Sequence, residues 1–180
     1  LSQKFIKEIN QLILVEPFYN EALTPEGKPT QKLITPGEYK KTPNSVRLPN
    51  GEMYSYPSPE ETPALMSDLI DWYHKEKNAK GLHPLQIAAL FHYKMVKIHP
   101  FDDSNGRTAR LLMNYILLKN AFAPLVVESK DKKNYLIALQ EADAGDMEAF
   151  ILYICNIGLR WQQLYTKAVK GERVEEEGDF

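Results

Sequence analysis

The stretch Lys97–Leu112 reads KIHPFDDSNGRTARLL and brings several kinds of functional side chain together. It holds a histidine, two adjacent aspartates, an Asn-Gly pair and two arginines spaced three residues apart. Helical apolar patterns precede and follow it, so we expect a short loop between two helices, with Pro100 ending the first. Ser104 or Asn105 then stands where it can cap the second helix. The stretch predicts a functional loop at a helix start.

This loop and the helical turn after it have the composition of a polyphosphate site. A helix start has unpaired N–H groups and partial positive charge, and Gly106 lets the chain come close to an anion. Arg107 and Arg110 share a helix face and can grip phosphate oxygens, while Asp103 is a hard oxygen donor suited to Mg²⁺. His99 can take a proton from a hydroxyl. These residues predict transfer of a phosphorus-containing group from a nucleotide to an alcohol.

The bulk composition describes an ordinary globular chain. Its 180 residues are 43% hydrophobic and 26% charged with a net charge of −2, so we expect neither nucleic acid nor a membrane as partner. No apolar run approaches the roughly 18 residues of a membrane span, and the start lacks the layout of a secretory signal. We therefore expect a cytoplasmic protein. The sequence does not decide between a monomer and a homodimer.

Helical periodicity dominates the chain, so we predict an all-α domain with one β-hairpin. The hairpin is expected at Ser45–Tyr56, where strand-like runs flank Asn50-Gly51, a pair typical of a type I′ turn. The segment 16–42 is rich in proline and glycine and is expected to be connecting structure. Helices are expected at residues 3–15, 62–76, 83–99, 106–121, 132–145 and 147–169.

Caps and composition set the expected limits of the domain. Ser2 stands where it can cap the first helix, and Thr62, followed by Pro63, where it can cap the second. The acidic end GERVEEEGDF is expected to fray. We expect one domain over residues 1–165, with its functional loop at 99–110, and a tail over 166–180.

The stretch HPFDDSNGRTAR resembles the signature of the Fic (Fido) family, HxFx(D/E)GN(G/K)RxxR, except that Ser104 stands where the family has glycine. The likeness continues in TPGEYKK from Thr35, in HPLQIAALFHYKMVKIHPF, and in YLIALQEADAGDMEAFILYI after the loop. It covers the chain from about Leu1 to Arg160. The resemblance implies a Fic-type helical domain in which the hairpin is the flap beside the active site.

The family resemblance also implies an activity, namely AMP transfer from ATP to a tyrosine, threonine or serine hydroxyl of a target protein. By position, His99 is the expected general base and Asp103 the expected ligand of a Mg²⁺ on the α- and β-phosphates. The residues expected around the ATP phosphates are Ser104, Asn105, Gly106, Arg107 and Arg110. Together they imply that ATP and Mg²⁺ are the substrate and cofactor.

Other positions receive expectations from the same resemblance. Phe101 should anchor the loop in the core, whereas Asp102 falls at a variable position and is expected to face only solvent. The target protein is expected to dock along the flap through main-chain hydrogen bonds. Tyr54 and Tyr56 alternate with Ser55 and could give one face of the flap aromatic contacts or be sites of self-modification.

The serine in place of the family glycine has two possible consequences. If that glycine takes a conformation closed to other residues, Ser104 strains the anion-binding turn by about 1–3 kcal/mol. Serine is small and can cap a helix, so we expect a working site with a modest loss. The alternative outside the enzymes is a binding module: a non-catalytic domain with a disabled site that binds a nucleotide or a peptide.

Alternative reactions use the same residues. Related sites can transfer a phosphate or another nucleotide, or remove AMP from a modified protein. His92 lies seven residues before His99 on one helical face, which allows a metal-dependent phosphohydrolase that also uses Asp102 and Asp103. No third ligand with convincing spacing is present, so we interpret His92 as a packing residue.

Many Fic proteins are restrained by a helix with the motif (S/T)xxxE(G/N), whose glutamate pairs with the second arginine of the signature, here Arg110. Ser2, Ser129 and Thr166 are followed four residues later by isoleucine or lysine, so none provides that glutamate. We expect the chain to be a fragment of a longer protein whose upstream part held the inhibitory motif. Arg110 would then be left free.

Overall fold

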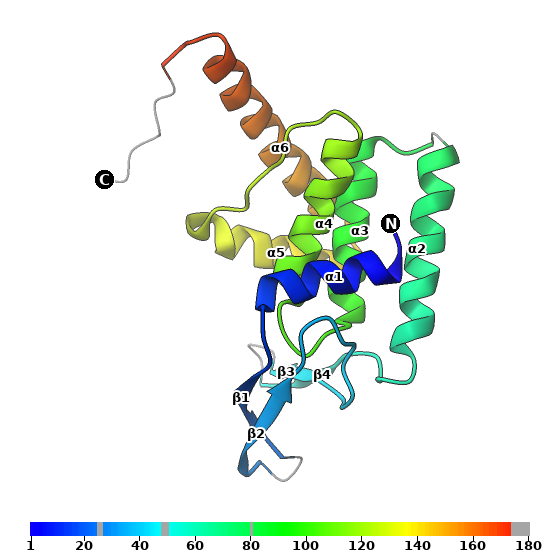
Figure 1. The fold of residues 1–180 in the computed structure, drawn as a ribbon. Helices are drawn as coiled ribbons and strands as arrows, with labels where there is room; N and C mark the ends of the chain where they lie inside the picture. The colour runs from blue at the N-terminus through cyan, green and yellow to red at the C-terminus, as the bar shows by residue number, and fades with distance from the viewer. Residues whose placement is uncertain (25–26, 48–50, 80, 174–180) are drawn as a thin grey trace. The chain divides into compact units, whose positions relative to one another are not determined.

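The computed structural model describes residues 1–24, 27–47, 51–79 and 81–173. Its helices are α1 (Gln3–Leu14), α2 (Thr62–Ala79), α3 (Pro84–Ile98), α4 (Asn105–Lys119), the 3₁₀ turn η1 (Ser129–Asp131), α5 (Lys132–Asp143) and α6 (Met147–Val169). Its strands are β1 (Phe18–Leu23), β2 (Pro29–Ile34), β3 (Ser45–Arg47) and β4 (Met53–Ser55). The predicted helical fold with a small antiparallel hairpin is confirmed (Figure 1).

Two compact units make up the chain. Unit 1 holds Leu1–Ala79 and Phe91–Leu112, and unit 2 holds Lys80–Leu90 and Met113–Phe180. Helices α3 and α4 each contribute residues to both units. The loop between α3 and α4 lies in unit 1 with α1, α2 and all four strands, so every candidate site residue belongs to this unit.

Helix α1 begins as predicted. The Ser2 side chain accepts a hydrogen bond from the Phe5 N–H at 3.2 Å, which confirms Ser2 as the cap. Ile6 is fully buried on the inner face of the helix. The helix ends at Leu14, one residue early, because Val15 has a φ of +68° that cannot continue a right-handed helix.

The start of α2 differs from the prediction, because Thr62 is not its cap. The Ser58 N–H donates to Glu61 Oε2 at 2.7 Å, and the Glu61 N–H donates to Ser58 Oγ at 3.3 Å. This reciprocal pair is a capping box. Thr62 is fully buried and donates its hydroxyl to the Ser58 carbonyl at 2.8 Å. The chain therefore turns helically one turn earlier than the Thr-Pro pair suggested.

A hairpin stands in the segment that we expected to be only connecting structure. Strands β1 and β2 are antiparallel, with Phe18 opposite Ile34. Most of their side chains are exposed, and Ile34 is the buried position of β2. The expectation was wrong because the two strands lack a clear apolar alternation, and Pro29, the first residue of β2, suggested a loop.

The predicted β3–β4 hairpin is confirmed. Its strands are antiparallel, and Val46 stands opposite Tyr54. Gly51 has the positive φ expected of its place near the turn, whereas Asn50, the other expected turn residue, lies outside the described residues. The rings of Tyr54 and Tyr56 meet edge to face at 5.1 Å between centroids. This confirms aromatic contacts at this end of the hairpin.

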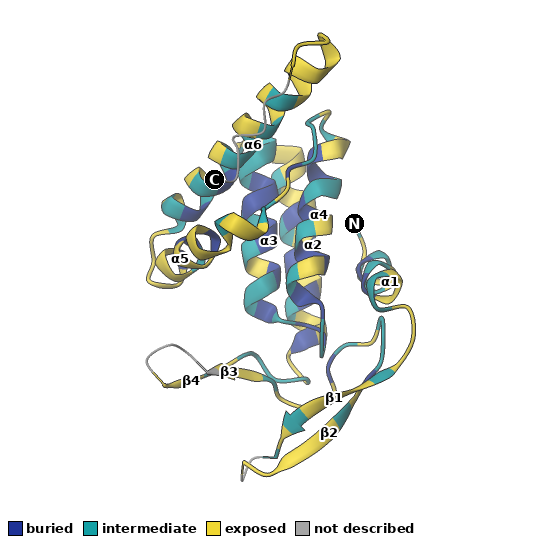
Figure 2. Ribbon diagram, turned by 90° about the vertical axis from the view of Figure 1, so that its left-hand side faces the viewer, coloured by how far each residue is buried: buried dark blue, intermediate teal, exposed yellow. Residues whose placement is uncertain are grey.

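In unit 1, buried positions line the inner faces of the helices, whereas the hairpins are largely exposed (Figure 2). Helix α1 crosses α4, and both hairpins lie beyond the loop that joins α3 to α4 (Figure 1). The large apolar side chains of this core are Ile6, Ile34, Met66, Leu69, Ile70, Tyr73, Phe91, Met95, Ile98, Phe101 and Leu112.

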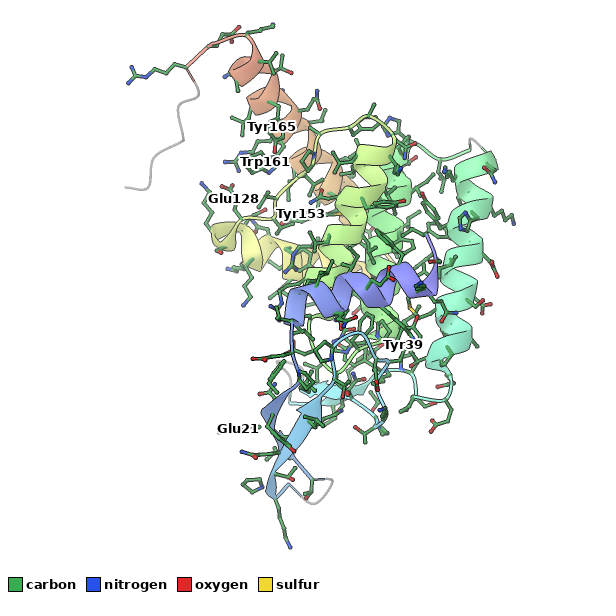
Figure 3. The ribbon with its side chains drawn as sticks, viewed as in Figure 1. Glu21, Tyr39, Glu128, Tyr153, Trp161 and Tyr165 are labelled. Atoms are coloured by element: carbon green, nitrogen blue, oxygen red, sulfur yellow. The ribbon has the colours of Figure 1, made fainter. Side chains whose placement is uncertain are left out.

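Unit 2 is built on α5 and α6 with parts of α3 and α4. Asp146 caps α6 by accepting from the Ala149 N–H at 3.1 Å. Trp161 and Tyr165 lie one turn apart on α6 (Figure 3), and the Trp161 indole donates to the Val126 carbonyl at 2.9 Å. No helix among the described residues combines the length and the apolar character needed to cross a membrane.

Candidate active site

The loop between α3 and α4 is closed by its own asparagine. Asn105 Oδ1 accepts a hydrogen bond from the Phe101 N–H at 2.9 Å, and Asn105 Nδ2 donates to the Phe101 carbonyl at 2.8 Å. Phe101 is 1% exposed and packs against the Tyr39 ring at 5.5 Å between centroids, so the predicted anchor is confirmed. The side chain of Asn105 therefore holds the loop instead of capping α4.

The segment between β2 and β3 runs beside this loop. Tyr39, which Figure 3 labels, forms an isolated antiparallel bridge with Phe101. The Lys40 N–H donates to the Pro100 carbonyl at 2.9 Å. These backbone contacts fix the TPGEYKK stretch against the signature, although about sixty residues separate them in the sequence.

Asn10 of α1 joins the same arrangement, and the sequence analysis did not find it. Its side chain is buried, and Oδ1 accepts from the Gly37 N–H at 2.9 Å. Nδ2 donates to the Asp103 carbonyl at 3.1 Å and lies 3.3 Å from Thr108 Oγ1. The available signal was a polar residue on the apolar side of an amphipathic helix. Asn10 links α1, the turn before Tyr39 and the loop.

His99 lies just after the end of α3, with its backbone in the left-handed region at a φ of +50°. Two amide groups reach its ring, with Asn44 Nδ2 at 2.9 Å and Asn105 Nδ2 at 3.1 Å from Nδ1. The Tyr56 ring stacks on the imidazole at 4.0 Å between centroids and an angle of 14°. The end of the β3–β4 hairpin thus covers one face of His99.

The surroundings of His99 keep its ring neutral. Burial is the largest cause that lowers the pKa of His99 to about 4, and the positive charge of Lys40 lowers it further. The negative charge of Asp103 opposes both effects without balancing them. At neutral pH the imidazole is therefore uncharged and has a lone pair that can accept a proton.

Basic side chains cluster over the first turn of α4. The Arg107 Nη2 atom lies 3.6 Å from Asp103 Oδ1, and both side chains are in contact with solvent. Arg110 lies one turn further along the helix, close enough to Gly106 that a Cβ there would stand 3.3 Å from Arg110 Nη1. The structure thus brings the two predicted arginines, the glycine and the aspartate to one end of α4.

Ser104 occupies the turn before α4 with a φ of +63°, the left-handed region that favours glycine. Its N–H donates to Asp103 Oδ1, and its carbonyl accepts from the Thr108 N–H at 2.9 Å. Its hydroxyl is buried and has no hydrogen-bond partner among the described residues. The Ser104 side chain therefore does not cap the helix, and neither does that of Asn105, so the expected side-chain cap from one or the other was wrong.

Asp102 is not a solvent-facing residue, contrary to the expectation. Its carboxylate forms an ion pair with Lys32 Nζ at 2.6 Å, and its side chain is 11% exposed. Lys32 belongs to β2, a strand that the sequence did not predict. Without that strand, nothing in the sequence placed a cation near this position.

His92 is a buried core residue, as its packing interpretation predicted. It is fully buried in α3, and burial lowers its pKa to about 3, with a further contribution from the charge of Arg110. The described parts of the chain contain no group of three or more His, Cys, Asp or Glu side chains that could hold a metal ion. The residues of the phosphohydrolase alternative therefore do not form a protein-ligated metal centre.

The family of the chain follows from its match to a protein-family model. The model of the Fic/DOC family matches residues 1–117. The chain belongs to the Fic/DOC family. Two curated Fic relatives are Protein adenylyltransferase Fic from Nematostella vectensis, 45% identical over 100 residues, and Protein adenylyltransferase fic-1 from Caenorhabditis elegans, 36% identical over 113 residues. The matches cover 56% and 63% of this chain but only 23% and 22% of those relatives.

Solved Fic structures share this fold. A Fic domain containing signaling protein from Bacteroides thetaiotaomicron superposes with a TM-score of 0.88 at 41% identity, over 99% of this chain and 66% of that one. Fic-1 from C. elegans gives a TM-score of 0.73 at 28% identity, over 95% of this chain and 44% of that one. The loop between α3 and α4 is therefore part of a domain with the Fic fold.

Proposed function

We propose that this Fic domain transfers AMP from ATP to a tyrosine, threonine or serine hydroxyl of a target protein. The observation that supports this most is the neutral His99 beside the start of α4, where Arg107 and Arg110 gather. A base and an anion site one loop apart suit attack of a hydroxyl on a phosphate. The names of the curated relatives, protein adenylyltransferases, support the same activity.

The triphosphate would bind at the N-terminal end of α4. Backbone N–H groups of the first turn point outward along the helix axis and favour an anion, and Gly106 leaves room for it. The side chain of Asn105 is already bonded to Phe101, so we assign its backbone to the α-phosphate. Arg107 and Arg110 would hold the remaining phosphates through charge-assisted hydrogen bonds.

Asp103 is the proposed Mg²⁺ ligand. Its carboxylate is 33% exposed at the edge of the loop, beside Arg107. A single protein carboxylate fits Mg²⁺, which takes its other ligands from phosphate oxygens and water. Bound there, Mg²⁺ would neutralise charge on the phosphates and on the leaving pyrophosphate.

His99 would act as the general base. The target hydroxyl gives its proton to the neutral imidazole while its oxygen bonds to the α-phosphorus. The bond from that phosphorus to the bridging oxygen of the β-phosphate breaks, and pyrophosphate leaves with the electron pair. The product is an AMP-modified hydroxyl, and the proton then passes from His99 to solvent.

The target segment would dock along the β3–β4 hairpin. Val46 and Met53 are 41% and 61% exposed on this hairpin, and its strands are paired only with each other among the described residues. An extended segment can add to such an edge by main-chain hydrogen bonds that do not depend on its side chains. Tyr56, which stacks on His99, marks the end of the hairpin where the acceptor hydroxyl would arrive.

Labelling with ATP tests this activity. Incubation with Mg²⁺, a lysate and ATP labelled at the α-phosphate should label target proteins, and mass spectrometry should find the mass of AMP. We expect His99→Ala to lower the rate by about 10²–10⁴-fold. His74→Ala, a change at an exposed histidine of α2, is the matched control. Transfer of phosphate alone, or equal labelling by His99→Ala, would contradict the proposal.

A non-catalytic nucleotide-binding module is the second candidate, because of Ser104. Its left-handed backbone and its buried hydroxyl, which lacks a partner among the residues that the structure describes, both disfavour serine at the turn that would hold the phosphates. Calorimetry with ATP and Mg²⁺ separates the two candidates. Binding without any turnover, in wild type and in Ser104→Gly alike, would favour the module.

A further inference from the structure

A buried lysine lies beside His99 without any role in the proposed reaction. Lys40 is 2% exposed, and its Nζ donates to Asn44 Oδ1 at 3.0 Å and to the Ile98 carbonyl at 3.2 Å. Burial lowers the pKa of Lys40 to about 8, partly opposed by the charge of Asp102, so it still carries a positive charge at neutral pH. Burying a charged group is costly, and no carboxylate among the described residues forms a direct ion pair with this one.

The ammonium group of Lys40 determines how the Asn44 amide is turned. An ammonium has only donors, so the oxygen of Asn44 must face it. The Nδ2 group of Asn44 then points the other way, towards His99 Nδ1 at 2.9 Å and the Phe101 carbonyl at 3.3 Å. A reversed amide would place a nitrogen against the ammonium and an oxygen against a carbonyl.

Asn105 is oriented by the backbone of Phe101 and reaches the same ring atom. The N–H and the carbonyl of Phe101 fix its Oδ1 and Nδ2, respectively. Its Nδ2 also lies 3.1 Å from His99 Nδ1. Two amide groups, whose oxygens accept from different donors, therefore present N–H donors to one nitrogen of the imidazole.

A neutral imidazole has one N–H and one lone pair, and an amide N–H can bond only to the lone pair. Nδ1 must therefore be the acceptor, and Nε2 must carry the hydrogen. We propose that Lys40 and Asn44 are positioning residues that hold the neutral His99 ring with its lone pair on Nδ1 and its hydrogen on Nε2. Lys40 acts through Asn44, and Asn105 supports the same tautomer from the other side.

This tautomer has a consequence for catalysis, which rests on the proposed function. The one lone pair that can take a proton from a hydroxyl is the one that Asn44 and Asn105 occupy. Asn105 is buried and bonded twice to Phe101, whereas Asn44 is half-buried and directly precedes β3. Asn44 is therefore the group that gives way to the acceptor hydroxyl.

A backbone hydrogen bond connects the replacement of Asn44 by the acceptor hydroxyl to the hairpin. The carbonyl of Asn44 accepts from the Tyr56 N–H at 3.1 Å, so the residues that flank the hairpin strands are bonded to each other. Their side chains both touch His99, through the amide of Asn44 and the ring of Tyr56. A target segment that docks on the hairpin can therefore move Asn44 and Tyr56, the two residues that cover His99.

NMR of ¹⁵N-labelled histidine side chains tests the proposal without nucleotide or turnover. His99 is identified by the signals that His99→Gln removes. In wild type above pH 6, long-range ¹H–¹⁵N spectra should show a protonated Nε2 and an unprotonated Nδ1 for His99. The same pattern in Lys41→Met, a change at the exposed neighbour of Lys40, is the matched control.

Two variants then address the positioning residues. Lys40→Met removes the ammonium at similar volume, so the Asn44 amide can turn, and we expect the Nδ1 signal to move towards the mixed-tautomer position and the pKa of His99 to rise. Asn44→Asp should protonate Nδ1, because a carboxylate accepts where the amide donated. In wild type the charges that bear on His99 are those of Lys40 and Asp103. Lys40→Met removes the first, Asn44→Asp adds a carboxylate, and the Tyr56 ring is unchanged in both.

The outcomes separate this inference from the proposed function. A wild-type His99 with hydrogen on Nδ1, or a Lys40→Met spectrum like that of Lys41→Met, overturns the positioning role whatever the activity. If Lys40→Met fails to fold, the wild-type and Asn44→Asp spectra still decide the tautomer and the part of Asn44. Absence of AMP transfer together with the expected spectra would refute the proposed function and leave the positioning role standing.

Discussion

The rings of Tyr56 and His99 stack at 4.0 Å between centroids, with only 14° between their planes. Tyr56 follows β4 at the end of the hairpin, and His99 follows α3, so residues far apart in the sequence form one stack. Because burial is the largest cause of the low pKa of His99, Tyr56 helps to set the charge of the ring that it covers.

Removing this cover should raise the pKa of His99. We expect Tyr56→Ala to move it from about 4 towards its ordinary value, because water reaches the exposed face of the ring. NMR titration of the histidine signals measures the change. Tyr56→Phe keeps the ring and should titrate like wild type, and Tyr54→Ala, on the same hairpin, is a second control. An unchanged titration in Tyr56→Ala would show that other groups exclude the water.

Ser104→Gly should stabilise the domain. Glycine removes the cost of a left-handed serine and a buried hydroxyl that has no hydrogen-bond partner in the described part of the chain. The greater entropy of glycine in the unfolded chain opposes part of this gain. The expected net gain in the free energy of unfolding is about 1 kcal/mol, measured by urea denaturation. Ser104→Ala keeps the left-handed cost and should gain less. A loss of stability in Ser104→Gly would mean that the hydroxyl makes a stabilising contact.

The same glycine variant should also transfer AMP faster if strain at this turn limits phosphate binding. The expected sign is a lower KM for ATP with the hairpin and His99 unchanged. Slower transfer would indicate that the Ser104 hydroxyl contacts the nucleotide.

Arg110→Ala should weaken the use of ATP and leave the fold intact. A charge-assisted hydrogen bond is worth about 1.5–3 kcal/mol, so the KM for ATP should rise roughly 10- to 100-fold. Circular dichroism checks that the helix content is kept. Arg160→Ala is the matched control, because Arg160 lies in unit 2 and pairs with Glu128 at 3.0 Å. Equal KM values in the two variants would show that Arg110 is an ordinary surface charge with no part in ATP binding.

Stability should fall as the pH drops below about 6.5. The pKa values of His92 and His99 in the folded protein are about 3 and 4, below the ordinary value of about 6.5. Between these limits the unfolded chain binds more protons than the folded one, so the free energy of unfolding decreases with falling pH. Urea denaturation at several pH values measures this slope.

Two substitutions identify the groups responsible for the pH dependence of stability in acid. His92→Gln removes the most buried imidazole, so its free energy of unfolding should depend less steeply on pH between about 6.5 and 4 than that of wild type. His99→Gln should reduce the slope in the same direction. Slopes equal to that of wild type in both variants would assign the acid sensitivity to carboxylates.

Features with a local signal could be predicted from the sequence. The helices follow from their apolar period, the β3–β4 hairpin from a turn pair between strand-like runs, and the site loop from one compact run of residues. In each case the residues that decide the structure lie within one element or one turn. Local propensity and periodicity are therefore sufficient.

Features made by distant partners could not be predicted. The Lys32–Asp102 ion pair and the Lys40–Asn44–His99 chain join segments separated by more than fifty residues. No periodicity announces such pairs, because each residue taken alone looks like an ordinary polar position. The left-handed conformation of Ser104 was foreseen as a possibility, since a family glycine stands there, and the backbone angle then settled it.

Asn10 defines how short a version of this domain can be made. It is the point where α1 holds the carbonyl of Asp103 and the amide of Gly37. Truncating the chain within α1 would therefore remove more than a peripheral helix. It would also remove the hydrogen bonds that hold the loop between α3 and α4. Protein engineers who want a minimal Fic module should treat the first helix as part of the candidate active site.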